Sequence, residues 1–115
     1  MKIIIVGVMQ EPQIAEIKGN FDSMKNIVGE SIQINLRPHD SSALVRHSEG
    51  SWLELPIARK FYCNGELVDI VHGTFFVCGT SLHGDHFISL TDEQIELYME
   101  KFKLSNCESG EDGNE

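Results

Sequence analysis

The chain has 115 residues, with 18 acidic and 9 basic side chains and a formal net charge of -9. Its hydrophobic content of 41% and charged content of 23% are typical of one globular domain and exclude collagen-like and wholly disordered chains. The shortage of cations argues against direct binding to DNA or RNA, because such binding depends on Lys and Arg side chains that neutralise phosphates.

The first part of the chain predicts two strands and a helix. The segment Lys2–Met9 is apolar on both faces and ends before Pro12, as expected of a central strand, and Gln13–Lys18 returns as a second strand. A helix of about ten residues follows Asn20 and is capped by Gly29. Its apolar residues recur at helical spacing and are Phe21, Met24, Ile27 and Val28.

The middle of the chain predicts strands and one tight hairpin. Residues alternate between apolar and polar in Ser31–Arg37, and Ala43–His47 resembles another strand. Apolar residues alternate again at Leu53, Leu55 and Ile57, up to Ala58. The dipeptide Asn64-Gly65 is the strongest local hairpin signal, because a type I′ turn needs positive φ at both positions. Of the aromatic residues beside this hairpin, Trp52 is interpreted as core rather than as an anchor for a partner.

The last part of the chain predicts a buried strand, a loop and a capped helix. The β-rich run Gly73–Gly79 should lie deep in a sheet, and Thr80–His86 is a loop. Thr91 and Gln94 form a capping box at the start of the final helix. Its buried stripe comprises Ile95, Tyr98, Met99 and Phe102.

Together these elements predict one α+β domain over residues 1–104, with a largely antiparallel, curved sheet of five or six strands and two helices on one face. Residues 105–115 have almost nothing to bury and are expected to form a flexible acidic tail. The tail holds four carboxylates and no basic residue, which leaves residues 1–104 with a net charge of -5.

Cysteine usage and hydropathy indicate the compartment. Cys63, Cys78 and Cys107 are an odd number without CxxC spacing, which favours a reducing interior over a disulfide-stapled secreted domain. No stretch approaches the roughly 20 apolar residues that a membrane span needs, and Ile3–Val6 is too short for a signal peptide. We therefore expect a cytoplasmic protein without membrane contact.

Two segments together carry a resemblance to a known family. Residues 73–79 read GTFFVCG and residues 87–95 read FISLTDEQI, and a Leu-Pro-x-x-Arg stretch spans Leu55 to Arg59. With the hydrophobic first strand, these resemble a family of small domains of unknown function that is common in phages and other mobile elements of low-GC Gram-positive bacteria. The resemblance covers most of residues 1–104 and implies an origin in mobile DNA within a bacterial host cell, where small acidic proteins often block defence enzymes.

Two kinds of enzyme site are possible by residue type. A thiol, two imidazoles and a carboxylate lie close together in sequence, and zinc uses such groups, but their spacing matches no strong zinc signature. These residues are Cys78, His83, Asp85 and His86. Cys78 ends an apolar strand, which favours a small core residue over a nucleophile activated by His72 or another histidine. We expect no catalytic residue, metal or cofactor, and a small metal-dependent hydrolase remains the enzyme alternative.

Acidic residues give the main candidate surface. Four of them lie on the final helix, and the tail extends the stripe. The candidate partner-binding residues are Asp92, Glu93, Glu96, Glu100, Glu108, Glu111 and Asp112. A stripe of carboxylates can imitate a nucleic acid and occupy the basic groove of an enzyme, and it can also serve solubility alone.

The sequence thus predicts a non-enzymatic protein that binds a host protein with a basic nucleic-acid-binding groove, such as a CRISPR nuclease. It would act as an anti-CRISPR-like or anti-restriction inhibitor by competing with guide RNA or target DNA. The alternative is a housekeeping interaction module of a phage or plasmid, whose acidic surface only keeps it soluble. Ionic strength separates the two, because mimicry predicts binding that weakens steeply with salt.

Overall fold

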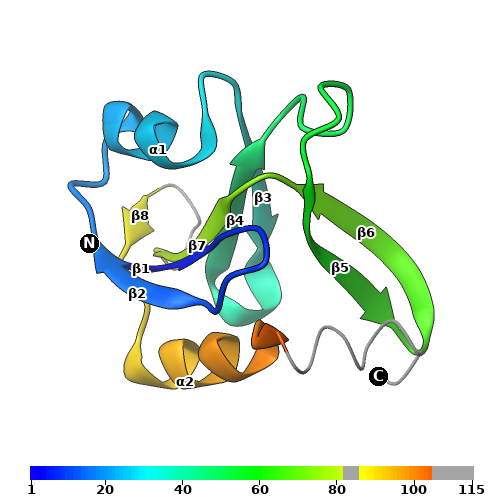
Figure 1. The fold of residues 1–115 in the computed structure, drawn as a ribbon. Helices are drawn as coiled ribbons and strands as arrows, with labels where there is room; N and C mark the ends of the chain where they lie inside the picture. Colours follow the sequence, from blue (N-terminus) through cyan, green and yellow to red (C-terminus); the bar gives the residue numbers. More distant parts are fainter. Residues whose placement is uncertain (82–85, 105–115) are drawn as a thin grey trace.

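The computed structural model describes residues 1–81 and 86–104, in which strands predominate. The elements, in chain order, are β1 (Lys2–Val6), β2 (Gln13–Glu16), α1 (Phe21–Val28), β3 (Ile32–Arg37), the 3-10 turn η1 (Pro38–Asp40), β4 (Ser42–His47), β5 (Ile57–Cys63), β6 (Glu66–His72), β7 (Phe75–Thr80), β8 (Phe87–Ile88) and α2 (Asp92–Lys101). Figure 1 shows their arrangement.

The main sheet has the strand order β2-β1-β7-β4-β3, and the short β8 also pairs with β7. All of its pairings are antiparallel. Strand β7 lies in the middle, and each of its six residues is buried. The apolar run within Gly73–Gly79 therefore does occupy the centre of the sheet, and the prediction of an α+β domain with a largely antiparallel sheet is confirmed.

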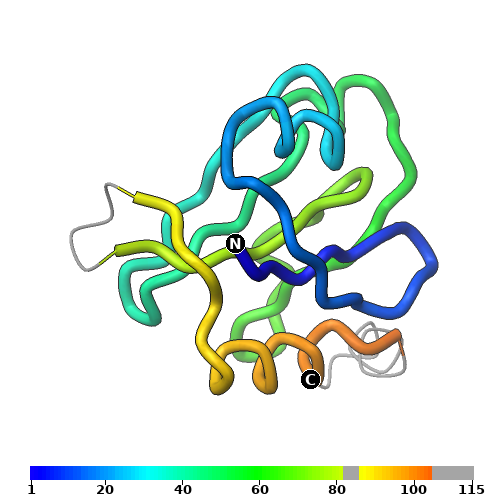
Figure 2. Tube along the Cα trace, turned by 90° about the vertical axis from the view of Figure 1, so that its left-hand side faces the viewer, coloured from blue at the N-terminus to red at the C-terminus, as the bar shows by residue number. Residues whose placement is uncertain are grey.

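The sheet buries apolar residues on both faces, because neighbouring residues of a strand point to opposite sides. Ile3 and Phe76 pack with Met24 of α1, whereas Ile4 and Phe75 pack with Tyr98 of α2. The two helices consequently cover opposite faces, with the strands between them (Figures 1 and 2). Placing both helices on one face was wrong, since central strands that are apolar on both sides need a cover on each.

Strands β5 and β6 form a separate two-stranded sheet that shares the α2 face of the main sheet. Its turn has positive φ at Asn64 (55°) and Gly65 (84°), as the predicted type I′ turn requires. Asp69 of β6 accepts two hydrogen bonds from the Arg46 guanidinium of β4, at 2.5 and 3.1 Å. This paired contact, together with buried Ala58 and Val71, fixes the hairpin against the main sheet.

The segment between β4 and β5 differs from the prediction. The amides of Leu53 and Leu55 donate to the carbonyls of Glu49 and Gly50, so consecutive turns replace the expected strand from Leu53. Trp52 lies in these turns with 83% of its surface exposed, and its interpretation as a core residue was wrong. Among the described residues no strand pairs with Leu53–Leu55, so the two alternate leucines lie in turns and not in a sheet.

Both helices begin where the sequence predicts. The Asn20 side chain accepts a hydrogen bond from the Ser23 amide at 2.8 Å, and α1 ends at Gly29 with φ 120°. Phe21, at the start of α1, is 62% exposed and does not join the buried stripe of Met24 and Val28. Within the described residues, neither helix has the length and apolar character needed to cross a bilayer.

Candidate functional site

The capping box of α2 fixes the first turn of the helix that carries the predicted acidic residues. Thr91 Oγ1 accepts from the Gln94 amide at 3.1 Å, and Gln94 Oε1 accepts from the Thr91 amide at 2.9 Å. The Tyr98 and Phe102 side chains pack into the core from one side of the helix. Asp92 and Glu93 lie in the first turn, where the helix dipole favours negative charge.

The opposite side of α2 carries the four predicted carboxylates together. Asp92, Glu93, Glu96 and Glu100 are all exposed, and we refer to them as the acidic face of α2. Glu100 Oε1 forms an ion pair with Lys103 Nζ at 3.0 Å. Leu97 is also 55% exposed on this side, so the surface combines charge with an apolar contact. The candidate residues Glu108, Glu111 and Asp112 lie outside the described residues.

The candidate metal cluster is divided between described and undescribed positions. His83 and Asp85 lie outside the described residues, and His86 is exposed. Cys78 is completely buried on the α1 face, and burial raises the pKa of its thiol to about 12. A thiol with this pKa is protonated at neutral pH and is a poor nucleophile or ligand. Within the described part of the chain, no group of three or more His, Cys, Asp or Glu is placed to hold a metal ion.

His72 and Cys63 occupy ordinary structural positions. Nδ1 of His72 lies 2.8 Å from the carbonyl oxygen of Leu55, within hydrogen-bond distance, as expected of a satisfied sheet histidine. Cys63 ends β5 beside the hairpin turn and is exposed, in agreement with its expected position.

Arg59 has a structural role that residue patterns did not predict. The residue is 2% exposed, and its guanidinium donates to the carbonyl oxygens of Gly7, Gln10, Ala58 and Phe102. A register shift between Ile57 and Arg59 places both Ala58 and Arg59 inside, as a β-bulge does. The Leu-Pro-x-x-Arg stretch of the family resemblance was the one signal that pointed to this residue.

A polar network that the sequence did not reveal connects α2 to the turn η1. Tyr98 OH donates to Asp40 Oδ2, and Ser42 Oγ donates to Asp40 Oδ1 at 2.6 Å. Burial alone would raise the pKa of Asp40, but these hydrogen bonds and the charges of His39 and Arg37 outweigh it and hold the pKa below 3.8. Gln94 Nε2 donates to the Asp40 carbonyl at 2.6 Å, so the same helix residue caps α2 and holds η1.

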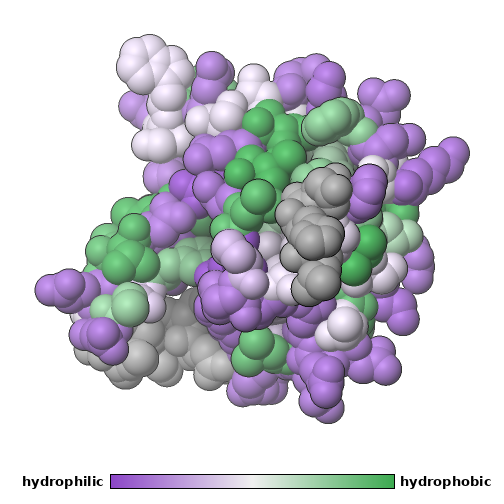
Figure 3. Space-filling view, turned by 180° about the vertical axis from the view of Figure 1, so that it is seen from behind, coloured by the Kyte–Doolittle hydropathy of each residue, from purple (hydrophilic) through white to green (hydrophobic). Residues whose placement is uncertain are grey.

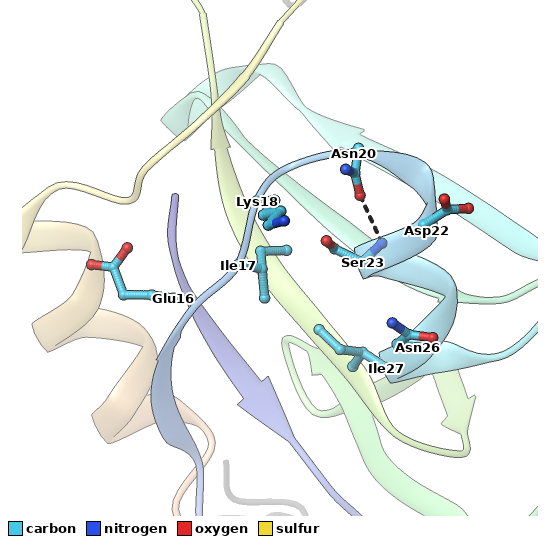
Figure 4. Close-up of a pocket in the computed structure, with 8 residues that line it drawn as sticks. All are labelled: Glu16, Ile17, Lys18, Asn20, Asp22, Ser23, Asn26 and Ile27. Carbon is cyan, nitrogen blue, oxygen red and sulfur yellow. Dashed lines mark hydrogen bonds between the residues drawn. The ribbon is translucent and has the colours of Figure 1, made fainter.

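A polar hollow lies between the end of β2 and the start of α1 and has a volume of about 530 Å³ (Figure 4). It is lined mainly by exposed polar side chains, including Lys18, Asp22 and Asn26. The Asn20 carboxamide oxygen, which also lines it, is already engaged with the Ser23 amide. The hollow therefore offers no unpaired buried group that would select a ligand.

Comparison with known proteins identifies the family of this chain. Among curated proteins and among solved structures, no match was found. The model of a domain of unknown function (DUF3846) matches residues 1–103, which include both helices and every described strand. The chain therefore belongs to the DUF3846 family of domains of unknown function.

Proposed function

We propose that this protein acts by binding rather than by catalysis, and that it inhibits a host defence enzyme directed at nucleic acids. The acidic face of α2 would occupy the basic groove in which that enzyme holds guide RNA or target DNA. In this proposal the protein is an anti-CRISPR-like or anti-restriction inhibitor, encoded by a phage or another mobile element and active in the cytoplasm of the bacterial host. The exposure of four carboxylates on one capped helix is the observation that supports it.

The spacing of these carboxylates suits a strand of phosphates. Asp92, Glu96 and Glu100 follow one another at four-residue intervals, which is a rise of about 6 Å along the helix axis for each step. Phosphates of one DNA strand repeat about every 3.4 Å along the duplex axis. One carboxylate would therefore stand for about every second phosphate, over a length of about 12 Å.

The charge of this face is largely uncompensated within the described residues. Asp92, Glu93 and Glu96 form no ion pair there, and only Glu100 is paired, with Lys103. The pairs Asp92 with Glu96 and Glu96 with Glu100 repel each other, each at a cost of about 0.2–0.5 kcal/mol to the helix. A basic partner would relieve this repulsion, which is why we favour a protein groove rich in Lys and Arg.

The experiment uses a variant that removes the charge and retains side-chain shape: Asp92→Asn with Glu93→Gln, Glu96→Gln and Glu100→Gln. Candidate partners are an RNA-guided nuclease and a restriction endonuclease from a low-GC Gram-positive bacterium. Inhibition of DNA cleavage is measured at 50 and 300 mM salt. We expect the wild-type chain to inhibit cleavage at 50 mM salt and to be at least tenfold less potent at 300 mM. At 50 mM, the variant should be less potent than the wild-type chain by a similar factor.

A matched control neutralises four exposed glutamates outside α2, namely Glu30, Glu49, Glu54 and Glu66. This control changes the net charge by the same amount and should inhibit as the wild-type chain does. Equal inhibition by both variants would contradict the proposed role of α2. A partner that binds without salt dependence and keeps its nuclease activity would instead identify a housekeeping interaction module.

A further inference from the structure

A cleft separates β3 and η1 from the β5–β6 hairpin on the α2 face of the main sheet. It has a volume of about 370 Å³, which is within the range of small-molecule sites. Viewed from behind, the surface is hollowed between the hairpin on the left and the body of the molecule (Figure 3). The residues that give the cleft its chemistry are Asn35, Arg37, His39, Phe61, Val68 and Asp69.

Two polar atoms of β3 are buried beside this cleft without a partner among residues 1–81 and 86–104. Asn35 Oδ1 has no hydrogen-bond donor there, and Arg37 Nη1 has no acceptor. The two residues are two positions apart on one strand, so their side chains share a face and their Cα atoms are separated by about 7 Å. Buried polar groups that stay unpaired lose the hydrogen bonds they would make to water, so an acceptor beside Arg37 and a donor beside Asn35 would stabilise the cleft.

Two cations gather at the same place although the chain is strongly acidic. The Arg37 guanidinium lies 5.8 Å from the Phe61 ring centroid and 6.0 Å from that of Tyr98. Lys101 Nζ lies 5.6 and 6.0 Å from the same two centroids. Neither cation forms an ion pair within the described residues. Burial, and then the charge of Arg37, lowers the pKa of Lys101, as expected where like charges are held together.

The nearby carboxylates do not neutralise this pair. Asp69 is engaged by Arg46 through two hydrogen bonds. Asp40 accepts from Ser42 and Tyr98, and its charge acts on Arg37 and Lys101 without a direct ion pair. The site therefore has two cations against one indirectly placed carboxylate, next to an unpaired guanidinium nitrogen.

We propose that this cleft binds a small molecule through an oxyanion, either a phosphate ester or a carboxylate, which the Arg37 guanidinium contacts. A second group on the ligand, an N–H or O–H, donates to Asn35 Oδ1. The Phe61 ring supplies an apolar wall, and Lys101 adds a second positive charge. The size of the cleft and the single pair of cations fit a small anion rather than a nucleic-acid strand. This site is independent of the acidic face of α2.

The test is an NMR titration of the full chain at constant ionic strength, in which inorganic phosphate, acetate or AMP replaces chloride. Adenosine, which is uncharged, is added at the same salt concentration. We expect saturable shifts at the Asn35 side-chain amide and the backbone amides of β3 with phosphate, with acetate, or with both. Saturation by only one of them identifies the type of oxyanion. If the cleft takes a phosphate ester with a second donor group, AMP should bind at least tenfold more tightly than phosphate, and adenosine should not bind.

Two variants of the cleft and one control variant show where the anion binds. Arg37→Met removes the proposed contact, and Asn35→Asp keeps the shape of the side chain but adds a repelling charge; each should weaken binding at least tenfold. Lys60→Met removes an equal charge at an exposed position of β5 and should leave binding unchanged. Linear shifts that do not saturate, or saturable shifts that persist in both cleft variants, would overturn the proposal and leave the cleft as a site for water and non-specific ions.

Discussion

Arg59 shows how one residue can hold several parts of this chain together. Its guanidinium joins β5 to the loop after β1, through Gly7 and Gln10, and to the end of α2, through Phe102. The last carbonyls of a helix have no partner within the helix, and the charged donor of Arg59 satisfies one of them. A buried charge is costly unless its hydrogen bonds are made, and the guanidinium of Arg59 makes hydrogen bonds to four backbone carbonyls.

We predict that Arg59→Met lowers the free energy of unfolding by about 3 kcal/mol or more. Methionine fills much of the space but leaves several buried carbonyl oxygens without a donor, each at a cost of about 1–3 kcal/mol. Arg59→Lys should recover only part of the loss, because an ammonium group cannot reproduce the planar fork. Urea unfolding measures the effect, and the exposed neighbour Lys60→Met is the control. A change below 1 kcal/mol in Arg59→Met would show that the network contributes little.

Single residues were predictable where the backbone or simple burial dictates them. Asn64 and Gly65 were identified because a tight hairpin requires positive φ, and Cys78 because it continues an apolar strand. The positions of Arg59 and Trp52 were not predictable, for opposite reasons. A bulge turns a charged residue inward, and a series of turns exposes an aromatic one. The burial of Arg59 depends on hydrogen bonds to distant backbone carbonyls, and the exposure of Trp52 depends on local turns. The periodicity of apolar residues encodes neither.

At the scale of elements, α2 is more than a capped helix on the surface. The Gln94 side chain uses its oxygen for the capping box and its nitrogen for the carbonyls of Asp40 and Ser41, at 2.6 and 3.3 Å. The first turn of α2 is thereby attached to η1, and Tyr98 repeats that attachment one turn later. The acidic face is consequently presented by a helix that is fixed to the sheet at two successive turns.

We predict that Gln94→Glu destabilises the fold by about 1–2 kcal/mol, although glutamate is as good as glutamine in an ordinary capping box. The glutamate oxygen that replaces Nε2 would face two carbonyl oxygens instead of donating to them. Thermal or urea unfolding at pH 7 measures the change, and Gln13→Glu at an exposed position of β2 is the control. Equal stability of the two variants would mean that the attachment to η1 is not important.

Element boundaries followed from local chemistry, whereas the placement of elements did not. The strand predicted over Ser31–Arg37 begins one residue before β3 and ends with it, and both helix starts agree with their caps. The side of the sheet on which each helix lies is decided by long-range packing of β1 and β7, whose two faces are equally apolar. The cleft beside β3 was also unpredictable, because Asn35 and Arg37 meet Phe61 only once the hairpin has folded over the sheet.

For the whole molecule, two layers of helix enclose one sheet, and the hairpin shares a layer with α2. All described core residues lie within positions 1–102, and the last described contact joins the Leu104 amide to Glu11 Oε1 at 3.1 Å. The prediction of one domain over residues 1–104 concerns this unit, and the family match over residues 1–103 covers nearly the same stretch.

We predict that a chain ending at Leu104 folds with the same stability as the full chain, within about 0.5 kcal/mol. The segment removed carries four carboxylates and little apolar surface. Urea unfolding of both chains measures the difference, and NMR spectra compare the dispersion of amide shifts. A loss of more than 1 kcal/mol would show that residues 105–115 contribute to folding and that the domain boundary lies further along the chain.

The central position of β7 has a consequence for synthesis on the ribosome. The β1–β2 and β3–β4 hairpins form from neighbouring segments, but only β7 joins them, and it begins at residue 75. The second hairpin is complete at His47 and β7 ends at Thr80, so at about 5–20 residues per second the nascent chain carries two separate hairpins for about 2–7 s. During that interval the edges of β1 and β4 that later receive β7 have no partner within the chain, which makes them binding sites for chaperones or for the strands of a neighbouring nascent chain.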